Sequence, residues 1–229
     1  MESLISTCLR IALQTIDDMS NFHQVFPLIV FEKKMTGFLP DLYKSFDDHK
    51  FDNSDGRVTG ELNGKVLVHQ DKRLHPFFKQ LRNAVIEYLE YFSIDPQAFN
   101  VNFTKTWFTI CDPGQSFPSH YHSCAHLSFV YYIQTPGDPL VIQHQNPNEW
   151  FGAAFSFVTE NKWNNGSAYA ITPKAEHLVI FPGKTEHYTE PEERKYQRIS
   201  LAGDIVLTLK RNKFSNEAGL LNPGYWKRF

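Results

Sequence analysis

Three histidines lie within seven positions in the stretch HYHSCAH, as His120, His122 and His126, directly before an apolar and aromatic run. In a β-strand, residues two positions apart point to the same face, so the rings of His120 and His122 are expected to share one space. Two imidazoles at that spacing provide half of a metal site. The candidate for a further ligand is His187, which follows the apolar run HLVIF and a Pro-Gly turn. The pattern therefore predicts a metal centre built from three imidazoles.

An arginine and a serine follow His187 at positions 198 and 200. Because they are two residues apart, a strand would place both on one face. The planar guanidinium of Arg198 offers a two-pronged donor set for a carboxylate, which a lysine cannot copy, and Ser200 would add a hydroxyl. The alternative is a surface arginine paired with Glu192 or Glu193, since arginine is usually exposed. The pair thus predicts a carboxylate receptor beside the metal.

Taken in order, these motifs resemble those of the Fe(II)- and 2-oxoglutarate-dependent oxygenases, most closely the 2OG-Fe(II) oxygenase group with an H-x-H, a distal His and an R-x-S. The resemblance covers roughly residues 74–209 and extends to DPGQSF before the first histidine, SFVYYI after it and FPG before the distal one. It implies a jelly-roll core, Fe(II) as the metal and 2-oxoglutarate as the cosubstrate. It assigns the metal to His120, His122 and His187, and the cosubstrate to Arg198, Ser200 and Tyr132.

One position departs from the family pattern. Residue 122 is a histidine, where most of the superfamily has Asp or Glu. We favour a three-histidine site in which His122 is a ligand. Alternatively, His122 does not bind and leaves a position for water or an anion, as in halogenating relatives, or the ligands shift to His122 and Cys124, which alters the spacing from Phe117. Three neutral imidazoles would leave the full +2 charge, which predicts weak iron retention without the dianionic cosubstrate.

Short strands are expected to position these residues. After Asn100 the chain consists of short runs rich in β-branched and aromatic residues, separated by turn residues such as DPG, PGD, NNG and PG. Such a pattern indicates a sandwich or barrel. The predicted strand segments are VNFTKTWFTI, HLSFVYYI, PLVIQH, SAYAIT, HLVIF and QRISLAGDIVLTL. A loop near the site is expected from Asn146 to Asn165.

Helices are expected before this β region. Apolar residues recur at intervals of three and four from Leu74 to Phe92, and Pro76 lies in the first turn, which predicts a helix. A shorter helix should follow Pro40, and the first twenty residues fit either helix or strand. We therefore expect a mainly β (α+β) fold, a double-stranded β-helix (jelly-roll or cupin-like) core with N-terminal helices packed on it.

One domain is expected to span residues 1–229. It would comprise an N-terminal helical or strand extension at 1–99, the jelly-roll core at 100–209 and a tail at 210–229 that packs Trp226 or Phe229 onto the body. A hydrophobic fraction of 41% in 229 residues is enough for a sizeable core.

Composition narrows the partners and the compartment. The net charge is −2 and the basic residues are scattered, which gives no electrostatic footprint for nucleic acid or anionic lipid. We therefore expect a small-molecule or amino-acid/peptide substrate, together with O₂. Three cysteines at unpatterned spacing do not indicate a disulfide framework, and no targeting or membrane-spanning segment is evident. The expected location is the cytoplasm, and the sequence does not specify an oligomeric state.

The resemblance implies oxidative decarboxylation of 2-oxoglutarate to succinate and CO₂, coupled to oxidation of a substrate C–H bond, most simply a hydroxylation. Halogenation remains an open variant. One alternative is a three-His dioxygenase of the cupin kind, which would need no 2-oxoglutarate and would leave Arg198 without a role. Another is a non-catalytic jelly-roll binding module with a structural metal, for which a closed four-ligand site would be expected.

Overall fold

Two antiparallel sheets form the body of the protein. The computed structural model describes residues 27–48, 67–143, 166–191, 196–210, 223–225 and 227. The larger sheet has the order β1 (Phe31–Lys34), β6 (His177–Pro182), β3 (Leu127–Gln134), β8 (Arg198–Leu209) and β2 (Phe99–Cys111). The smaller sheet has the order β5 (Ala168–Ile171), β4 (Leu140–Gln143) and β7 (Glu186–Thr189). The predicted mainly β, double-stranded β-helix architecture is confirmed.

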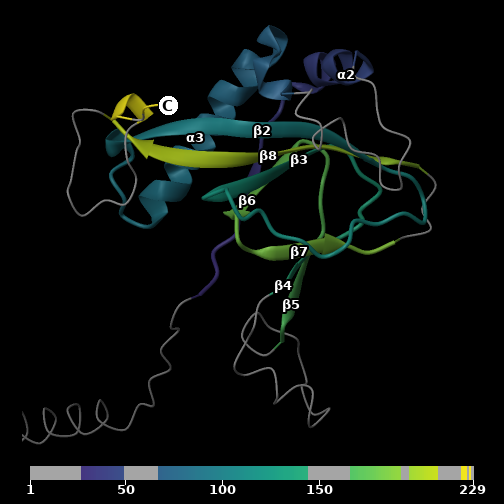
Figure 1. The fold of residues 1–229 in the computed structure, drawn as a ribbon. Helices are drawn as coiled ribbons and strands as arrows, with labels where there is room; N and C mark the ends of the chain where they lie inside the picture. The colour runs from purple at the N-terminus through teal and green to yellow at the C-terminus, as the bar shows by residue number, and fades with distance from the viewer. Residues whose placement is uncertain are drawn as a thin grey trace, which may run out of the picture.

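Two α-helices cover the outer face of the larger sheet, and the smaller sheet lies on its other side (Figure 1). They are α2 (Leu39–Asp47) and α3 (His75–Tyr91), each with a proline in its first turn, where a missing N–H costs nothing. Both agree with the predicted helices. Short 3₁₀ turns occur at Val68–Gln70, Lys72–Leu74, Pro96–Ala98 and Pro223–Tyr225. No helix among the described residues is long and apolar enough to cross a membrane.

Strand β8 separates the core from the interior cavity by simple alternation. Its residues Ile199, Leu201 and Ile205 belong to the hydrophobic core beneath the helices. The alternate residues, from Arg198 to Asp204, line a cavity between the two sheets. Because side chains of a strand alternate between faces, the same strand serves the core and the site.

Two strands were not predicted from the sequence. β1 has the sequence FEKK and, among the described strands, pairs with β6 alone, at the edge of the larger sheet. Charged residues are common on edge strands, where they discourage further pairing, and they mask the apolar pattern. β7 is four residues long and carries His187. The expected loop at Asn146–Asn165, the first twenty residues, Trp226 and Phe229 lie outside the described residues.

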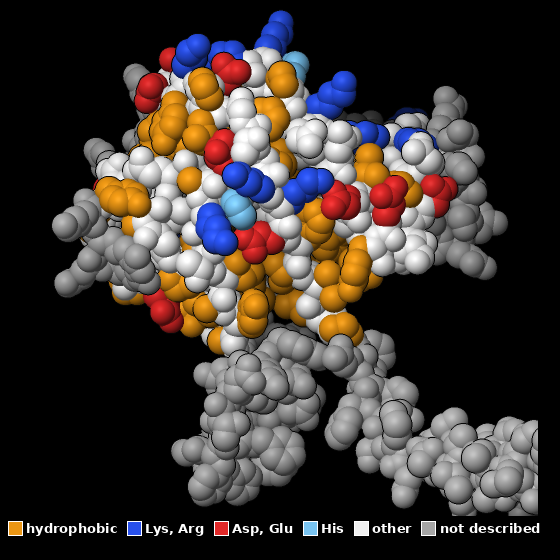
Figure 2. Space-filling model, turned by 180° about the vertical axis from the view of Figure 1, so that it is seen from behind, with side chains coloured by type: hydrophobic (Ala, Val, Ile, Leu, Met, Phe, Trp, Pro, Cys, Tyr) orange, Lys and Arg blue, Asp and Glu red, His pale blue; other side chains and the backbone are white. Residues whose placement is uncertain are grey.

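The surface carries charges of both signs. On the face shown in Figure 2, Lys and Arg side chains are interspersed with Asp and Glu side chains. Ion pairs on the described surface include Arg73 with Asp48 and Asp71, and Nδ1 of His177 lies 3.0 Å from a carboxylate oxygen of Glu32. This mixture agrees with the small net charge of the whole chain, −2.

Candidate metal and cosubstrate site

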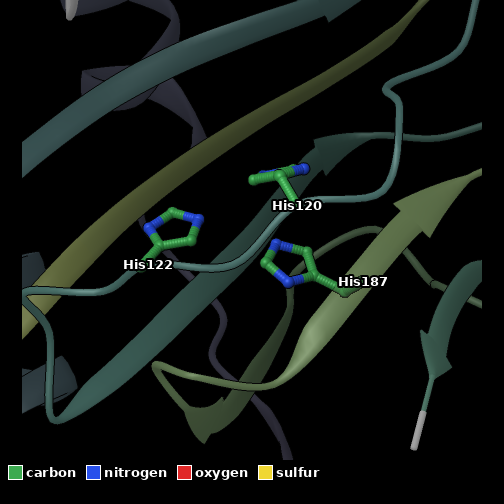
Figure 3. A group of neighbouring side chains, drawn as sticks. All are labelled: His120, His122 and His187. Atoms are coloured by element: carbon green, nitrogen blue, oxygen red, sulfur yellow. The ribbon is translucent and has the colours of Figure 1, made fainter.

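The fold brings His120, His122 and His187 together. His120 pairs with His187 of β7 through two backbone hydrogen bonds, with N–O distances of 3.1 and 3.0 Å, and the N–H of His122 donates to the carbonyl of Gly183 at 2.8 Å. The three rings point toward one another, two from one extended segment and one from β7 (Figure 3). One ring nitrogen from each lies within 4.8 Å of the other two.

Each of the three imidazoles is oriented by a hydrogen bond at Nδ1. That atom of His120 lies 2.8 Å from the carbonyl oxygen of Pro118, and that of His187 lies 2.9 Å from the carbonyl oxygen of Thr185. Nδ1 of His122 contacts a carboxylate oxygen of Asp204. Because these partners accept hydrogen bonds, each Nδ1 is the donor, which leaves Nε2 of each imidazole as the nitrogen for a metal.

This donor set fits a transition-metal ion. Three neutral imidazole nitrogens suit Fe, Zn and Cu alike, and partners at the second ring nitrogen are usual for metal-bound histidines. Among the described residues, these three histidines are the only group of three or more His, Cys, Asp or Glu side chains close enough to hold one ion.

His126, the third histidine of the sequence cluster, has a different role. Its Nδ1 accepts a hydrogen bond from the backbone N–H of Leu207 at 2.9 Å, and it is not part of the metal-ligating group. Cys124 is exposed and is not in the group either. The alternative ligand pair of His122 and Cys124 therefore finds no support in the geometry.

The buried position of His187 predicts a pH-dependent stability. Burial is the main cause that lowers its pKa from 6.5 to about 4. The unfolded chain binds this proton near pH 6.5 and the native chain only near pH 4. The contribution of the unprotonated ring to the free energy of unfolding is therefore fully present above pH 6.5 and is lost as the pH decreases toward 4. The expected loss is about 3 kcal/mol.

Denaturant unfolding of the metal-free protein between pH 4 and 7.5 measures this loss. His187→Asn is a suitable comparison, because its side-chain amide can still donate to the carbonyl of Thr185. We expect the stability difference between wild type and variant to shift in favour of the variant as the pH falls. A difference that stays constant with pH contradicts the prediction.

Arg198 lies inside the protein rather than at the surface, with 3% of its area exposed. Its Nη2 donates to the hydroxyl of Thr189 at 3.2 Å, and its guanidinium carbon lies 5.6 Å from the centre of the Phe117 ring. Its buried Nη1 has no hydrogen-bond partner among the described residues. A buried cation with an unused donor is a strong receptor for an anion, because burial without a partner is costly.

The two other predicted cosubstrate residues lie close to Arg198. The hydroxyl of Ser200 is 2.6 Å from that of Thr109, and both residues are buried. Tyr132 is 1% exposed, and burial raises its pKa to about 12, so its hydroxyl remains protonated at neutral pH. Both residues line the same cavity as Arg198.

One cavity joins the imidazoles to the guanidinium. It has a volume of about 300 Å³, and its lining includes all six residues predicted from the sequence: His120, His122, Tyr132, His187, Arg198 and Ser200. Its wall also includes residues that the sequence analysis did not assign to the site, among them Trp107, Thr189 and Asp204. Of these, Asp204 offered a signal in the sequence, because it is the one acidic residue of the strand RISLAGDIVLTL.

The sequence itself matches a family model. Residues 105–204 match the family described as "Putative 2OG-Fe(II) oxygenase". This segment contains every residue of the predicted site. A comparison with curated proteins finds no match.

Several solved structures are similar to the chain at low sequence identity. The chain is similar to the α-ketoglutarate-dependent carbocyclase SnoK from nogalamycin biosynthesis, with a TM-score of 0.52 and 8% identity over 80% of this chain and 82% of SnoK. A Pseudomonas putida prolyl-4-hydroxylase aligns with a TM-score of 0.49 and 14% identity over 78% and 92% of the two chains. An oxidoreductase of the 2OG-Fe(II) oxygenase family from Burkholderia pseudomallei aligns with a TM-score of 0.47 and 12% identity over 73% of this chain and 76% of that protein. The likeness to SnoK supports the double-stranded β-helix.

Proposed function

We propose that the chain is a 2OG-Fe(II) oxygenase that hydroxylates a small molecule or an amino-acid side chain, because residues 105–204 match that family's model. Its cofactors would then be Fe(II) and 2-oxoglutarate. The reaction would consume 2-oxoglutarate, O₂ and a substrate C–H bond, and would release succinate, CO₂ and the corresponding alcohol. The bound ferrous ion would supply the activation of O₂. The observation that carries the proposal is that Arg198, which is buried and has no hydrogen-bond partner for Nη1 among the described residues, lines the same cavity as the three convergent imidazoles.

Each predicted residue has a distinct task in this proposal. His120, His122 and His187 would hold the metal through Nε2, since every Nδ1 is already hydrogen-bonded. Arg198 would bind the far carboxylate of 2-oxoglutarate with its unused Nη1. Tyr132 and Ser200 would donate hydroxyl hydrogen bonds on the same side, which orients the cosubstrate toward the metal.

The cavity limits how much of a substrate can enter. Its volume of about 300 Å³ is at the lower end of typical ligand pockets, and 2-oxoglutarate would occupy part of it. We therefore propose that only the reacting part of the substrate, such as one side chain or one ring, enters the cavity. The outer end of the cavity is lined by the half-buried or exposed residues Tyr121, Ser123 and Tyr188.

Release of succinate tests the proposal. Anaerobically reconstituted protein with Fe(II) and 2-oxoglutarate should form succinate once O₂ is admitted, at a slow uncoupled rate even without the prime substrate. Protein treated with a metal chelator is the control and should form none. Absence of succinate from Fe(II)-loaded protein that demonstrably binds 2-oxoglutarate would contradict the proposal.

The three-His dioxygenase of the cupin kind remains the second candidate, because the three imidazoles suit it equally well. It would not require 2-oxoglutarate. The burial of Arg198 beside the metal site favours the 2-oxoglutarate-dependent reaction, since a cupin-type enzyme would give this cation no ligand.

A further inference from the structure

Asp204 lies beside the imidazole cluster without belonging to it. Its side chain is 6% exposed, and Oδ1 accepts hydrogen bonds from Nδ1 of His122 and, at 3.4 Å, from the hydroxyl of Ser128. It is not among the residues whose ligand atoms converge within 4.8 Å. The carboxylate thus stands one side chain away from the position that a metal would occupy.

His122 differs from the other two histidines in the charge of its partner. The Nδ1 atoms of His120 and His187 face backbone carbonyls, each two residues earlier in the chain. That of His122 faces a carboxylate, and its ring is also stacked on Trp107, with centroids 5.6 Å apart and an interplanar angle of 15°. The ring of His122 is therefore held on one face by Trp107 and at Nδ1 by Asp204. Of the three Nδ1 partners, Asp204 is the one that is a carboxylate.

We infer that Asp204 is a positioning residue of the metal centre that supplies, through His122, the negative charge that a carboxylate at position 122 would otherwise place directly on the metal. This inference rests on the proposed function, because it assumes that His122 binds the metal. A carboxylate bonded to the second nitrogen of a ligating imidazole fixes the ring orientation and increases its basicity. The combined charge of the metal, the three imidazoles and Asp204 is then +1.

This charge changes the expectation for iron retention. Three neutral imidazoles alone would leave a +2 centre that depends on the dianionic cosubstrate for neutralisation. With Asp204 buried behind His122, the centre has the same overall charge as one with two histidines and one carboxylate ligand. We therefore expect the protein to hold a divalent ion without 2-oxoglutarate.

Co(II) titration of the metal-free protein tests the inference independently of turnover. Asp204→Asn removes the charge but keeps an oxygen that can accept from His122, and it should weaken Co(II) binding by about 10- to 100-fold. The Co(II)-loaded variant should bind 2-oxoglutarate more tightly than wild type, because a negative charge near the dianion has been removed. If Asp204 had a purely structural role, its replacement would not weaken Co(II) binding and at the same time strengthen 2-oxoglutarate binding.

Ser128→Ala is the matched control. It deletes a hydrogen bond to the same carboxylate from a neighbouring buried position and leaves the charge of Asp204 in place. We expect its Co(II) affinity to remain within about threefold of wild type, since the charge of Asp204 is retained and the deleted hydrogen bond is long, at 3.4 Å, and therefore weak. Thermal unfolding of the metal-free variants should show that both remain folded.

A double-variant cycle gives a second, sign-based test. His122→Asp moves a carboxylate to the metal and places it beside Asp204, where two buried like charges repel. Adding Asp204→Asn should therefore strengthen Co(II) binding in the His122→Asp background, although it weakens binding in wild type. The inference would be overturned if Asp204→Asn changed Co(II) affinity in the same direction in both backgrounds, or if its Co(II) affinity in the wild-type background stayed within threefold of wild type.

The failure of the proposed function would look different. In that case wild type would form no succinate from 2-oxoglutarate, whatever the Co(II) affinity of the Asp204 variant. If Asp204 were itself a ligand in place of His122, His122→Ala would retain Co(II) with nearly wild-type affinity while Asp204→Asn would not, and that result would also overturn the inference.

Discussion

Replacing Arg198 with methionine is expected to raise the 2-oxoglutarate concentration that half-saturates the Co(II)-loaded protein by at least about 30-fold, because removal of one partner from a buried charge pair costs about 2–5 kcal/mol. Arg198→Lys should also weaken binding, since an ammonium lacks the two-pronged geometry. Calorimetric titration of the metal-loaded protein with 2-oxoglutarate measures both changes. Co(II) affinity measured without 2-oxoglutarate should be unchanged.

The same substitution should not destabilise the protein when 2-oxoglutarate is absent. Arg198 is buried with an unused donor, so methionine, which is of similar length and uncharged, removes an unfavourable burial. The free energy of unfolding of Arg198→Met should equal or exceed that of wild type. Arg73→Met, at an exposed arginine paired with Asp71 and Asp48, is the control and should leave 2-oxoglutarate binding unaltered.

These results would separate the two enzymatic hypotheses. A three-His dioxygenase that binds its substrate directly on the metal would be indifferent to Arg198, and Arg198→Met would then retain its activity. A loss of both 2-oxoglutarate binding and succinate formation, with metal affinity preserved, is the outcome that a 2-oxoglutarate-dependent oxygenase requires.

Removal of any one of the three imidazoles is expected to weaken metal binding by about 70-fold or more. A four-ligand zinc site contributes about 10–16 kcal/mol in total, so one ligand accounts for about 2.5–4 kcal/mol. His120→Ala, His122→Ala and His187→Ala should therefore show losses of similar size in Co(II) titrations. His177→Ala, which removes a histidine paired with Glu32 at the surface, is the control and should bind as wild type does.

The His122 variant decides between the readings of position 122. If this residue leaves a coordination position for water or an anion, as in halogenating relatives, His122→Ala would retain Co(II) while the other two variants lose it. Its hydrogen bond to Asp204 and its approach to His187, with ring centroids 5.3 Å apart, favour a role as a ligand.

The sequence predicted the elements with a strong internal pattern. The helix of α3 and the long strands β2, β3 and β8 follow from apolar periodicity and turn residues. It did not predict β1 or β7, because a four-residue strand such as FEKK or EHYT contains no period that differs from a loop. Such strands form because neighbouring strands offer unpaired backbone groups.

The convergence of the site could not be derived from spacing alone. His120 and His187 are far apart in the chain, and their pairing depends on how β7 folds back beside the segment around His120. The resemblance to a family supplied that connection. Asp204 was missed because its importance depends on which ring its carboxylate meets, and this is a property of the register between β8 and the residues near His122.

The alternation along β8 has a consequence for engineering. Arg198 and Asp204 lie on the same side of one continuous strand, so the backbone of β8 fixes the distance between the residue proposed to bind the cosubstrate and the residue proposed to support the metal ligand His122. An insertion of a single residue between them would turn one of the two away. Attempts to change the substrate should therefore leave the length of β8 unchanged and instead vary the residues at the outer end of the cavity, such as Tyr121 and Tyr188.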